Sequence, residues 1–172
     1  MTSISQTAGA IAAILLFTVG MAHTDGAGDP TAVSSQDGEY FDRDGNATFK
    51  IANDGTVDWY TYVGYLRYGA NCLQCHGPDG LGSSYGPSLV DSLKSLSHAD
   101  FLSIVVGGKK DVNTAQELVM PPFGTNRNVM CYIDPIYVYL RARSDGALGR
   151  QRPEKHEPKP DAFTKAENSC MG

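Results

Sequence analysis

The sequence predicts a mainly α-helical protein. Apolar residues recur at helical spacing in residues 56–70, 97–108 and 134–146, and each stretch begins near a residue that commonly caps a helix. No run of alternating polar and apolar residues lies between residues 56 and 148. The 172 residues are enough for one domain with a hydrophobic core and hardly enough for two.

The first predicted helix covers residues 56–70. Thr56 is its expected N-cap, and Asp58 lies in the first turn, where a negative charge favours a helix N-terminus. The apolar and aromatic side chains at helical spacing are Trp59, Tyr62, Val63 and Leu66. These positions predict an amphipathic helix.

The second and third predicted helices carry clearer boundary signals. Residues 97–108 open with Ser97 as the expected N-cap and close with two glycines. Residues 134–146 open with Asp134 as the expected N-cap and Pro135 at the first helical position. Loops rich in glycine and proline separate the three helices. These loops hold most of the residues that could bind a cofactor or a metal ion.

Four segments divide the chain. Residues 1–22 are read as a signal peptide because a short apolar run, too short to span a bilayer, is followed by small residues. No Lys or Arg precedes this run, so a buried core helix or a retained anchor is the alternative. Residues 23–55 form an acidic, loop-rich extension, residues 56–148 the core domain, and residues 149–172 a polar, proline-rich C-terminal extension.

Charge excludes one class of partner. Residues 23–70 contain eight acidic and three basic residues, which gives a formal charge of −5, equal to that of the whole chain. A strongly basic face is absent, so nucleic acid is not an expected partner. Within this acidic part, Asp42 to Asn46 resemble the start of a calcium loop, but the glutamate that completes such a loop is missing, which favours Asx turns.

The most specific motif is Cys72-Leu-Gln-Cys75-His76. The Cys-x-x-Cys-His pattern is typical of covalent haem c attachment, in which two thioethers bind the porphyrin and the histidine ligates the iron. A zinc site would need a second ligand pair of similar spacing, and a thioredoxin-like redox pair would need a βαβ setting. A disulfide between Cys72 and Cys75 would leave His76 unexplained, so one covalent haem is the favoured interpretation.

An electron carrier also needs a sixth iron ligand, usually a methionine in a downstream loop. Met120 lies in the loop sequence VMPPFG, where two prolines restrict the chain, and is the favoured ligand. Met130, just before Cys131, is the alternative and reads more like a core residue. Two histidines outside the motif, His98 and His156, are weaker candidates that are expected to face solvent.

These residues resemble the class I cytochromes c. The stretch GYLRYGANCLQCH is similar to the first helix of that family, and YVYLRAR is similar to its last helix, with Tyr139 packed across Gly64. The sequence GPSL, residues 86–89, resembles the haem-crevice loop. This implies that the carbonyl of Pro87 accepts a hydrogen bond from His76. The implied fold is a set of helices around one covalently bound haem, with long N- and C-terminal extensions.

A more specific resemblance runs from about residue 39 to residue 149. The blocks at residues 54–68, 75–89 and 119–148 are similar to the cytochrome c-L family, and most similar to its members that serve lanthanide-dependent methanol dehydrogenase. These are periplasmic electron acceptors of PQQ-dependent methanol or alcohol dehydrogenases. They pass electrons to a further cytochrome c or an oxidase, and they are not themselves enzymes. In this family a disulfide tethers the C-terminal extension, which implies the pair Cys131–Cys170.

Three basic residues are candidates for docking a redox partner. Lys109, Lys110 and Arg127 are expected in loops that flank Met120, where they would surround an exposed haem edge. A competing class is a haem sensor or peroxidase-like protein with an open sixth coordination site, although the sequence offers no obvious acid–base pair for it. A third possibility is a haem subunit within a larger dehydrogenase complex. No stable membrane insertion is expected after signal removal.

Overall fold

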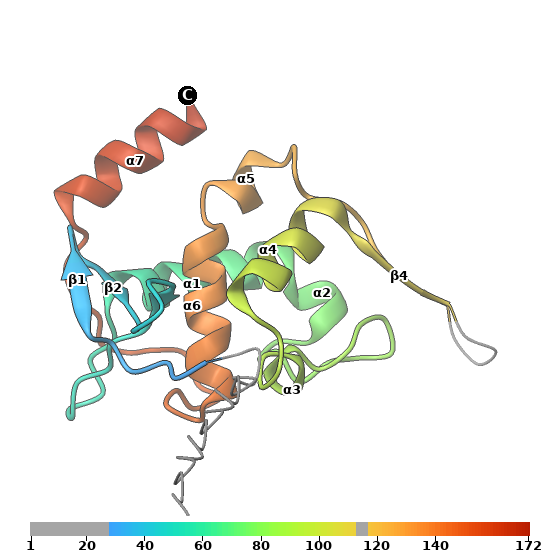
Figure 1. Ribbon diagram of the computed structural model, residues 1–172, viewed down its shortest axis with the longest axis horizontal. Coiled ribbons are helices and arrows are strands. Elements are labelled where there is room, and N and C mark those ends of the chain that lie inside the picture. The colour runs from blue at the N-terminus through green and yellow to red at the C-terminus, as the bar shows by residue number, and fades with distance from the viewer. Residues whose placement is uncertain (1–27, 113–116) are drawn as a thin grey trace, which may run out of the picture.

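A computed structural model describes residues 28–112 and 117–172 (Figure 1). The predicted signal peptide, residues 1–22, lies outside the described residues. The mainly helical class is confirmed, with two small sheets added to it. In chain order the elements are β1 (Ser34–Gln36), β2 (Glu39–Phe41), β3 (Ala47–Thr48), α1 (Trp59–Asn71), α2 (Leu73–His76), α3 (Leu89–Ser92), α4 (His98–Gly107), β4 (Lys109–Val112), β5 (Glu117–Met120), α5 (Arg127–Met130), α6 (Ile133–Ser144) and α7 (Asp161–Met171). None of the helices in the described ranges is long and apolar enough to span a membrane.

The two long helices α1 and α6 cross at Gly64, and this crossing is the centre of the core (Figure 1). A Cβ atom on Gly64 would lie 1.9 Å from the backbone oxygen of Pro135 and 2.9 Å from the Cβ of Tyr139. Only glycine allows the two backbones to approach this closely. The packing of Tyr139 across Gly64, implied by the resemblance, is therefore present in the structure.

The first turn of α1 differs from the prediction, because Asp58 and not Thr56 is the N-cap. The two carboxylate oxygens of Asp58 accept hydrogen bonds from the backbone N–H of Thr61 at 2.8 Å and from its hydroxyl at 2.6 Å. Thr56 instead forms hydrogen bonds to Asp54, its neighbour in the preceding turn. A carboxylate can accept several hydrogen bonds at once, so the aspartate satisfies the free N–H groups of the first turn better than the threonine.

The other two predicted helices are present, with one changed cap. Ser97 caps α4 as expected, accepting a hydrogen bond from the backbone N–H of Asp100 at 3.1 Å. Helix α6 begins one residue before Asp134, and its N-cap, Tyr132, makes no side-chain cap bond. The carboxylate of Asp134 lies 3.0 Å from the ring of His98 instead. The predicted cap was wrong because this aspartate links α6 to the start of α4.

Residues 28–55 form turns and short strands, as expected of the acidic extension. Strands β1, β2 and β3 pair antiparallel in a three-stranded sheet. The Asx-turn interpretation of the Asp42 loop is confirmed, because one Asp42 oxygen accepts hydrogen bonds from the backbone N–H groups of Asp44 and Asn46, both at 2.9 Å. No group of three potential metal ligands occurs in the described ranges.

An antiparallel hairpin of β4 and β5 was not predicted. It pairs Lys109 with Met120 at one end and Val112 with Glu117 at the other. The sequence analysis placed Met120 in a loop, whereas it is the last residue of β5. The error has a physical reason: each strand has only four residues, too few to give a clear alternating pattern, and each is stable only through the other.

The C-terminal extension is folded onto the core domain. Its residue His156 pairs in parallel with Val57, and the backbone N–H of Val57 donates to the carbonyl of Lys155 at 3.1 Å. Helix α7 follows, a helix that composition did not reveal, and buries Phe163 against the core. A disulfide joins Cys131 to Cys170, the pair implied by the resemblance.

Candidate haem site

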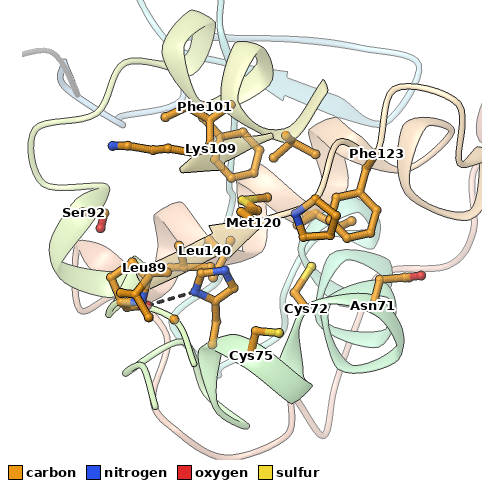
Figure 2. A pocket seen from close by; sticks show the side chains of 18 of the residues that line it. Asn71, Cys72, Cys75, Leu89, Ser92, Phe101, Lys109, Met120, Phe123 and Leu140 are labelled. Carbon is orange, nitrogen blue, oxygen red and sulfur yellow. Dashed lines mark hydrogen bonds between the residues drawn. The ribbon is translucent and has the colours of Figure 1, made fainter. Parts of the chain in front are cut away.

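One cavity of about 250 Å³ lies between the end of α1, α2, the α3–α4 segment, the β4–β5 hairpin and α6 (Figure 2). Its lining is mainly apolar and includes the side chains of Leu89, Phe101 and Leu140. The three motif residues Cys72, Cys75 and His76 line it, and so does Met120. The fold thus brings the Cys-x-x-Cys-His motif and Met120, which lie far apart in the sequence, to the same cavity.

The chain turns sharply at the Cys-x-x-Cys-His motif. Helix α1 ends at Asn71, Cys72 is both its C-cap and the N-cap of α2, and α2 is a single turn that ends at His76. Gly77 then takes a φ of 77°, a left-handed conformation that favours glycine, and stops the helix. One helical turn therefore presents both thiols and the imidazole to the cavity.

The ring of His76 is held in one orientation and one tautomer. Its Nδ1 lies 2.9 Å from the carbonyl oxygen of Pro87, and because a carbonyl can only accept, Nδ1 carries the proton and donates. This leaves the Nε2 lone pair free to bind a metal. Gly86 is required beside it, since a Cβ at that position would lie 3.0 Å from the imidazole ring. The contact matches the role that the resemblance implied for Pro87.

Two supporting residues were not given a role in the site from the sequence. The hydroxyl of Tyr68 donates to the carbonyl of Gly77 at 2.5 Å, and the hydroxyl of Ser83 donates to the carbonyl of Cys75 at 2.6 Å. Both satisfy backbone groups where the chain leaves the motif, so they fix the loop that carries Pro87. No local sequence signal marks them, because their partners become neighbours only in the folded chain.

Met120 lies on the wall of the cavity that the hairpin supplies. Figure 2 shows its side chain projecting between Phe101 and the two cysteines. The chain around it is restrained: a Cβ on Gly108 would lie 2.7 Å from the carbonyl oxygen of Met120, and two prolines follow. Met130 lies in α5, packs against the hydrophobic core, and is not among the residues that line the cavity.

The two weaker candidates, His98 and His156, do not line the cavity. His98 contacts Asp134 and the ring of Tyr137, and its side chain is only 16% exposed. Its expected exposure to solvent was therefore wrong, because the start of α4 packs against α6. His156 is exposed and stacks on Tyr62 with ring centroids 3.8 Å apart.

The alternatives for the motif find no support in the geometry. Burial raises the pKa of the Cys72 thiol to about 12, and a neutral thiol is a poor nucleophile for a redox pair. Within the described ranges no three His, Cys, Asp or Glu side chains gather as a metal site. By contrast, haem c fits the donor set. Two thiols lie at one side of an apolar cavity, and an imidazole nitrogen and a thioether sulfur share its interior.

The three basic docking candidates occupy different positions. Lys109 and Lys110 lie in strand β4 and Arg127 in helix α5, so the expectation that they lie in loops was wrong. Lys109 lines the cavity, and Lys110 does not. A guanidinium nitrogen of Arg127 donates to the carbonyl of Met171 at 3.0 Å, which ties it to the C-terminal extension.

Comparison with known proteins agrees with this site. The family described as cytochrome c oxidase, cbb3-type, subunit III matches residues 63–140. Cytochrome c-553I of Paracoccus denitrificans is 52% identical over 143 residues, which cover 83% of this chain and 63% of that protein. Cytochrome c-555 of Methylococcus capsulatus is 39% identical over 100 residues, 58% of this chain and 75% of that protein.

A solved structure is also similar. The c-type cytochrome XoxG from Methylobacterium extorquens AM1 superimposes with a TM-score of 0.76 and 54% identity, over 82% of this chain and 86% of that one. The chain spans less than two thirds of the Paracoccus relative but most of the other two proteins. Cavity, motif and relatives agree: the chain belongs to the family of c-type cytochromes, whose cofactor is covalently bound haem c.

Proposed function

We propose that the protein is a periplasmic monohaem electron carrier. It accepts electrons one at a time from a PQQ-dependent methanol or alcohol dehydrogenase and passes them to a further cytochrome c or an oxidase. One observation supports this most directly: His76 and Met120 line the same apolar cavity, with Cys72 and Cys75 beside them. Histidine and methionine together are the axial ligands typical of electron-transfer cytochromes c.

The side chains have separate tasks in this proposal. Cys72 and Cys75 would hold the haem covalently, and the Pro87 carbonyl orients the ring of His76 so that its Nε2 would be free to bind the iron. Met120 would be the second protein ligand of the iron and would exclude water and other ligands. Haem c, when bound, supplies an iron that takes up and releases one electron. The apolar walls keep water from the iron, which favours the less charged reduced state.

Electrons enter and leave where the cavity opens. Tyr85 and Val119 line the cavity and are 73% and 49% exposed, and Cys75, which also lines it, is exposed as well. A partner that docks here would come close to the haem edge. Electron transfer over a short distance needs no substrate pocket. Lys110 lies on the same hairpin and is exposed, so we expect reduction rates to fall as ionic strength rises.

The dehydrogenase partner rests on the resemblance of the blocks at residues 54–68, 75–89 and 119–148 to cytochromes c-L. The test is stopped-flow mixing of the oxidised holoprotein with a purified PQQ-dependent dehydrogenase and its alcohol. We expect second-order reduction that needs both the enzyme and the alcohol, with two cytochromes reduced per alcohol.

Three results would count against the proposal. If the dehydrogenase leaves the protein oxidised while dithionite reduces it, the assigned electron donor is wrong. If the reduced protein binds carbon monoxide readily, the sixth position is open and the sensor or peroxidase-like class takes precedence. Purification from the source organism as a stable complex with the dehydrogenase would favour the structural-subunit class over a diffusing carrier.

A further inference from the structure

The cavity face of the β4–β5 hairpin carries a positive charge that axial ligation does not explain. Lys109 and Met120 are direct partners in the antiparallel register, so their side chains share one face of the hairpin. Both line the cavity, whereas Lys110, the next residue on β4, does not. We propose that the ammonium group of Lys109 pairs with a propionate of the haem and raises its reduction potential.

The position of Lys109 follows from where the cysteines lie. Cys72 and Cys75 would bind the two vinyl groups, which sit on one edge of the porphyrin, and the two propionates sit on the opposite edge. In Figure 2 the lysine nitrogen lies on the opposite side of the view from Cys72 and Cys75. Attachment at the two cysteines would therefore orient the ring with its carboxylates toward Lys109.

The charge balance of the cavity supports the same pairing. Among the described residues that line it, Lys109 is the one lysine or arginine, and Asp111 is the one carboxylate. Two propionates add negative charge to a largely apolar space, where an unpaired carboxylate is unfavourable. Lys109 is the cation available to offset it, and its aliphatic stem can cover apolar wall while the ammonium reaches the anion.

The pairing has a redox consequence. The oxidised iron carries one more positive charge than the reduced iron, so a nearby cation favours reduction. For a unit charge roughly 10 Å from the iron, effective dielectric constants of about 80 and 20 shift the ratio of reduced to oxidised protein about 2-fold and about 20-fold. Loss of the Lys109 charge should therefore lower this ratio at a fixed potential, within that range.

The test compares K109Q with K110Q in the purified holoprotein, by spectroelectrochemical titration at low ionic strength. These variants remove the same charge from adjacent residues on opposite faces of β4. We expect K109Q to lower the reduced-to-oxidised ratio clearly more than K110Q does, and K109R to restore a ratio near that of the wild type. A K109Q potential equal to that of K110Q would overturn the proposal.

The inference rests on the proposed haem carrier, but its failure is distinguishable from failure of that function. The far-red methionine–iron absorption band reports ligation and should remain in both lysine variants. If the band remains and only the potential difference is missing, the lysine–propionate pair is wrong and the carrier stands. If Lys109 only docks the dehydrogenase, K109Q slows stopped-flow reduction and leaves the potential unchanged, which also overturns the proposal.

Discussion

At the scale of the residue, Met120 separates an electron carrier from a protein with an open iron site. Replacing Met120 with alanine should abolish the far-red methionine–iron band and lower the reduction potential, because the thioether favours ferrous iron. Met130→Ala is the matched control, since Met130 packs against the core and does not line the cavity. This variant should keep the band. Large-to-small changes in a core cost about 2–5 kcal/mol, and because Met130 is only partly buried its loss of stability should lie at or below the lower end of that range. A band that survives in Met120→Ala and vanishes in Met130→Ala would reverse the assignment.

Glu39 is a second residue whose environment has a measurable consequence. Burial, with the negative charge of Asp134 in addition, raises the pKa of Glu39 to about 7, while Tyr60 and His98 act in the opposite direction. Between pH 4.5 and about 7 the folded protein keeps the proton that the unfolded chain has lost. The free energy of unfolding should therefore fall as pH rises through this window.

The size of this effect is modest because Glu39 is only half-buried. After allowance for solvent screening we expect a loss of about 1–2 kcal/mol between pH 5 and pH 8. Glu39→Gln should remove most of this slope in urea unfolding measured at several pH values. Glu117→Gln, at an exposed position, should leave it in place. An unchanged slope in Glu39→Gln would show that other groups cause it.

At the scale of the element, the crossing of α1 and α6 depends on the absence of a side chain. Gly64→Ala would place a methyl group 1.9 Å from the backbone oxygen of Pro135, and a backbone atom cannot move aside as a flexible side chain can. We expect a loss of about 3 kcal/mol or more, at the upper end for overpacked cores. Chemical denaturation of the holoprotein, monitored by circular dichroism, measures it.

Gly69 provides the matched control within α1. A Cβ at Gly69 meets no heavy atom within 4 Å, so Gly69→Ala changes helix propensity alone. It should stabilise the protein by about 0.5–1 kcal/mol. If the two alanine variants were equally stable, close contact at the crossing would not be the reason for Gly64.

An element could be predicted from the sequence when the contacts that stabilise it lie close together along the chain. Helix α4 was predicted with its cap because Ser97 and Asp100 interact within one turn. The β4–β5 hairpin was missed because its short strands are stable only as a pair, and α7 because its stabilising partners lie elsewhere in the chain. Phe163 of α7 packs edge-on against Tyr60 of α1 with ring centroids 5.1 Å apart, a contact that composition cannot reveal.

At the scale of the whole molecule, the Cys-x-x-Cys-His motif predicted one wall of the candidate haem site. The other walls depend on how the rest of the chain folds. Cys72, Cys75 and His76 are adjacent in sequence, so their shared orientation follows from one helical turn. The position of Met120 needed the hairpin, and the roles of Tyr68 and Ser83 needed the loop that returns to the motif. Local chemistry was therefore readable from the sequence, and long-range support was not.

The C-terminal extension ties distant parts of the molecule together. The ring of Tyr132 stacks beneath the guanidinium of Arg67 at 3.6 Å, and its hydroxyl donates to Glu167 of α7 at 2.5 Å. Glu167 also pairs with Lys159, and Phe163 is buried beside them. The disulfide Cys131–Cys170 closes this arrangement across 39 residues of sequence.

Removing that disulfide should lower stability without changing the haem. The double variant Cys131→Ser/Cys170→Ser frees a loop of about 40 residues in the unfolded chain, a loss of about 4 kcal/mol in the chain-entropy view. Guanidinium unfolding of the holoprotein measures it, and reduction of the wild type should produce a similar loss. The far-red band should remain, because neither cysteine lines the cavity. Free thiols in the denatured, unreduced wild-type holoprotein would contradict the bridge, since Cys72 and Cys75 are then thioethers.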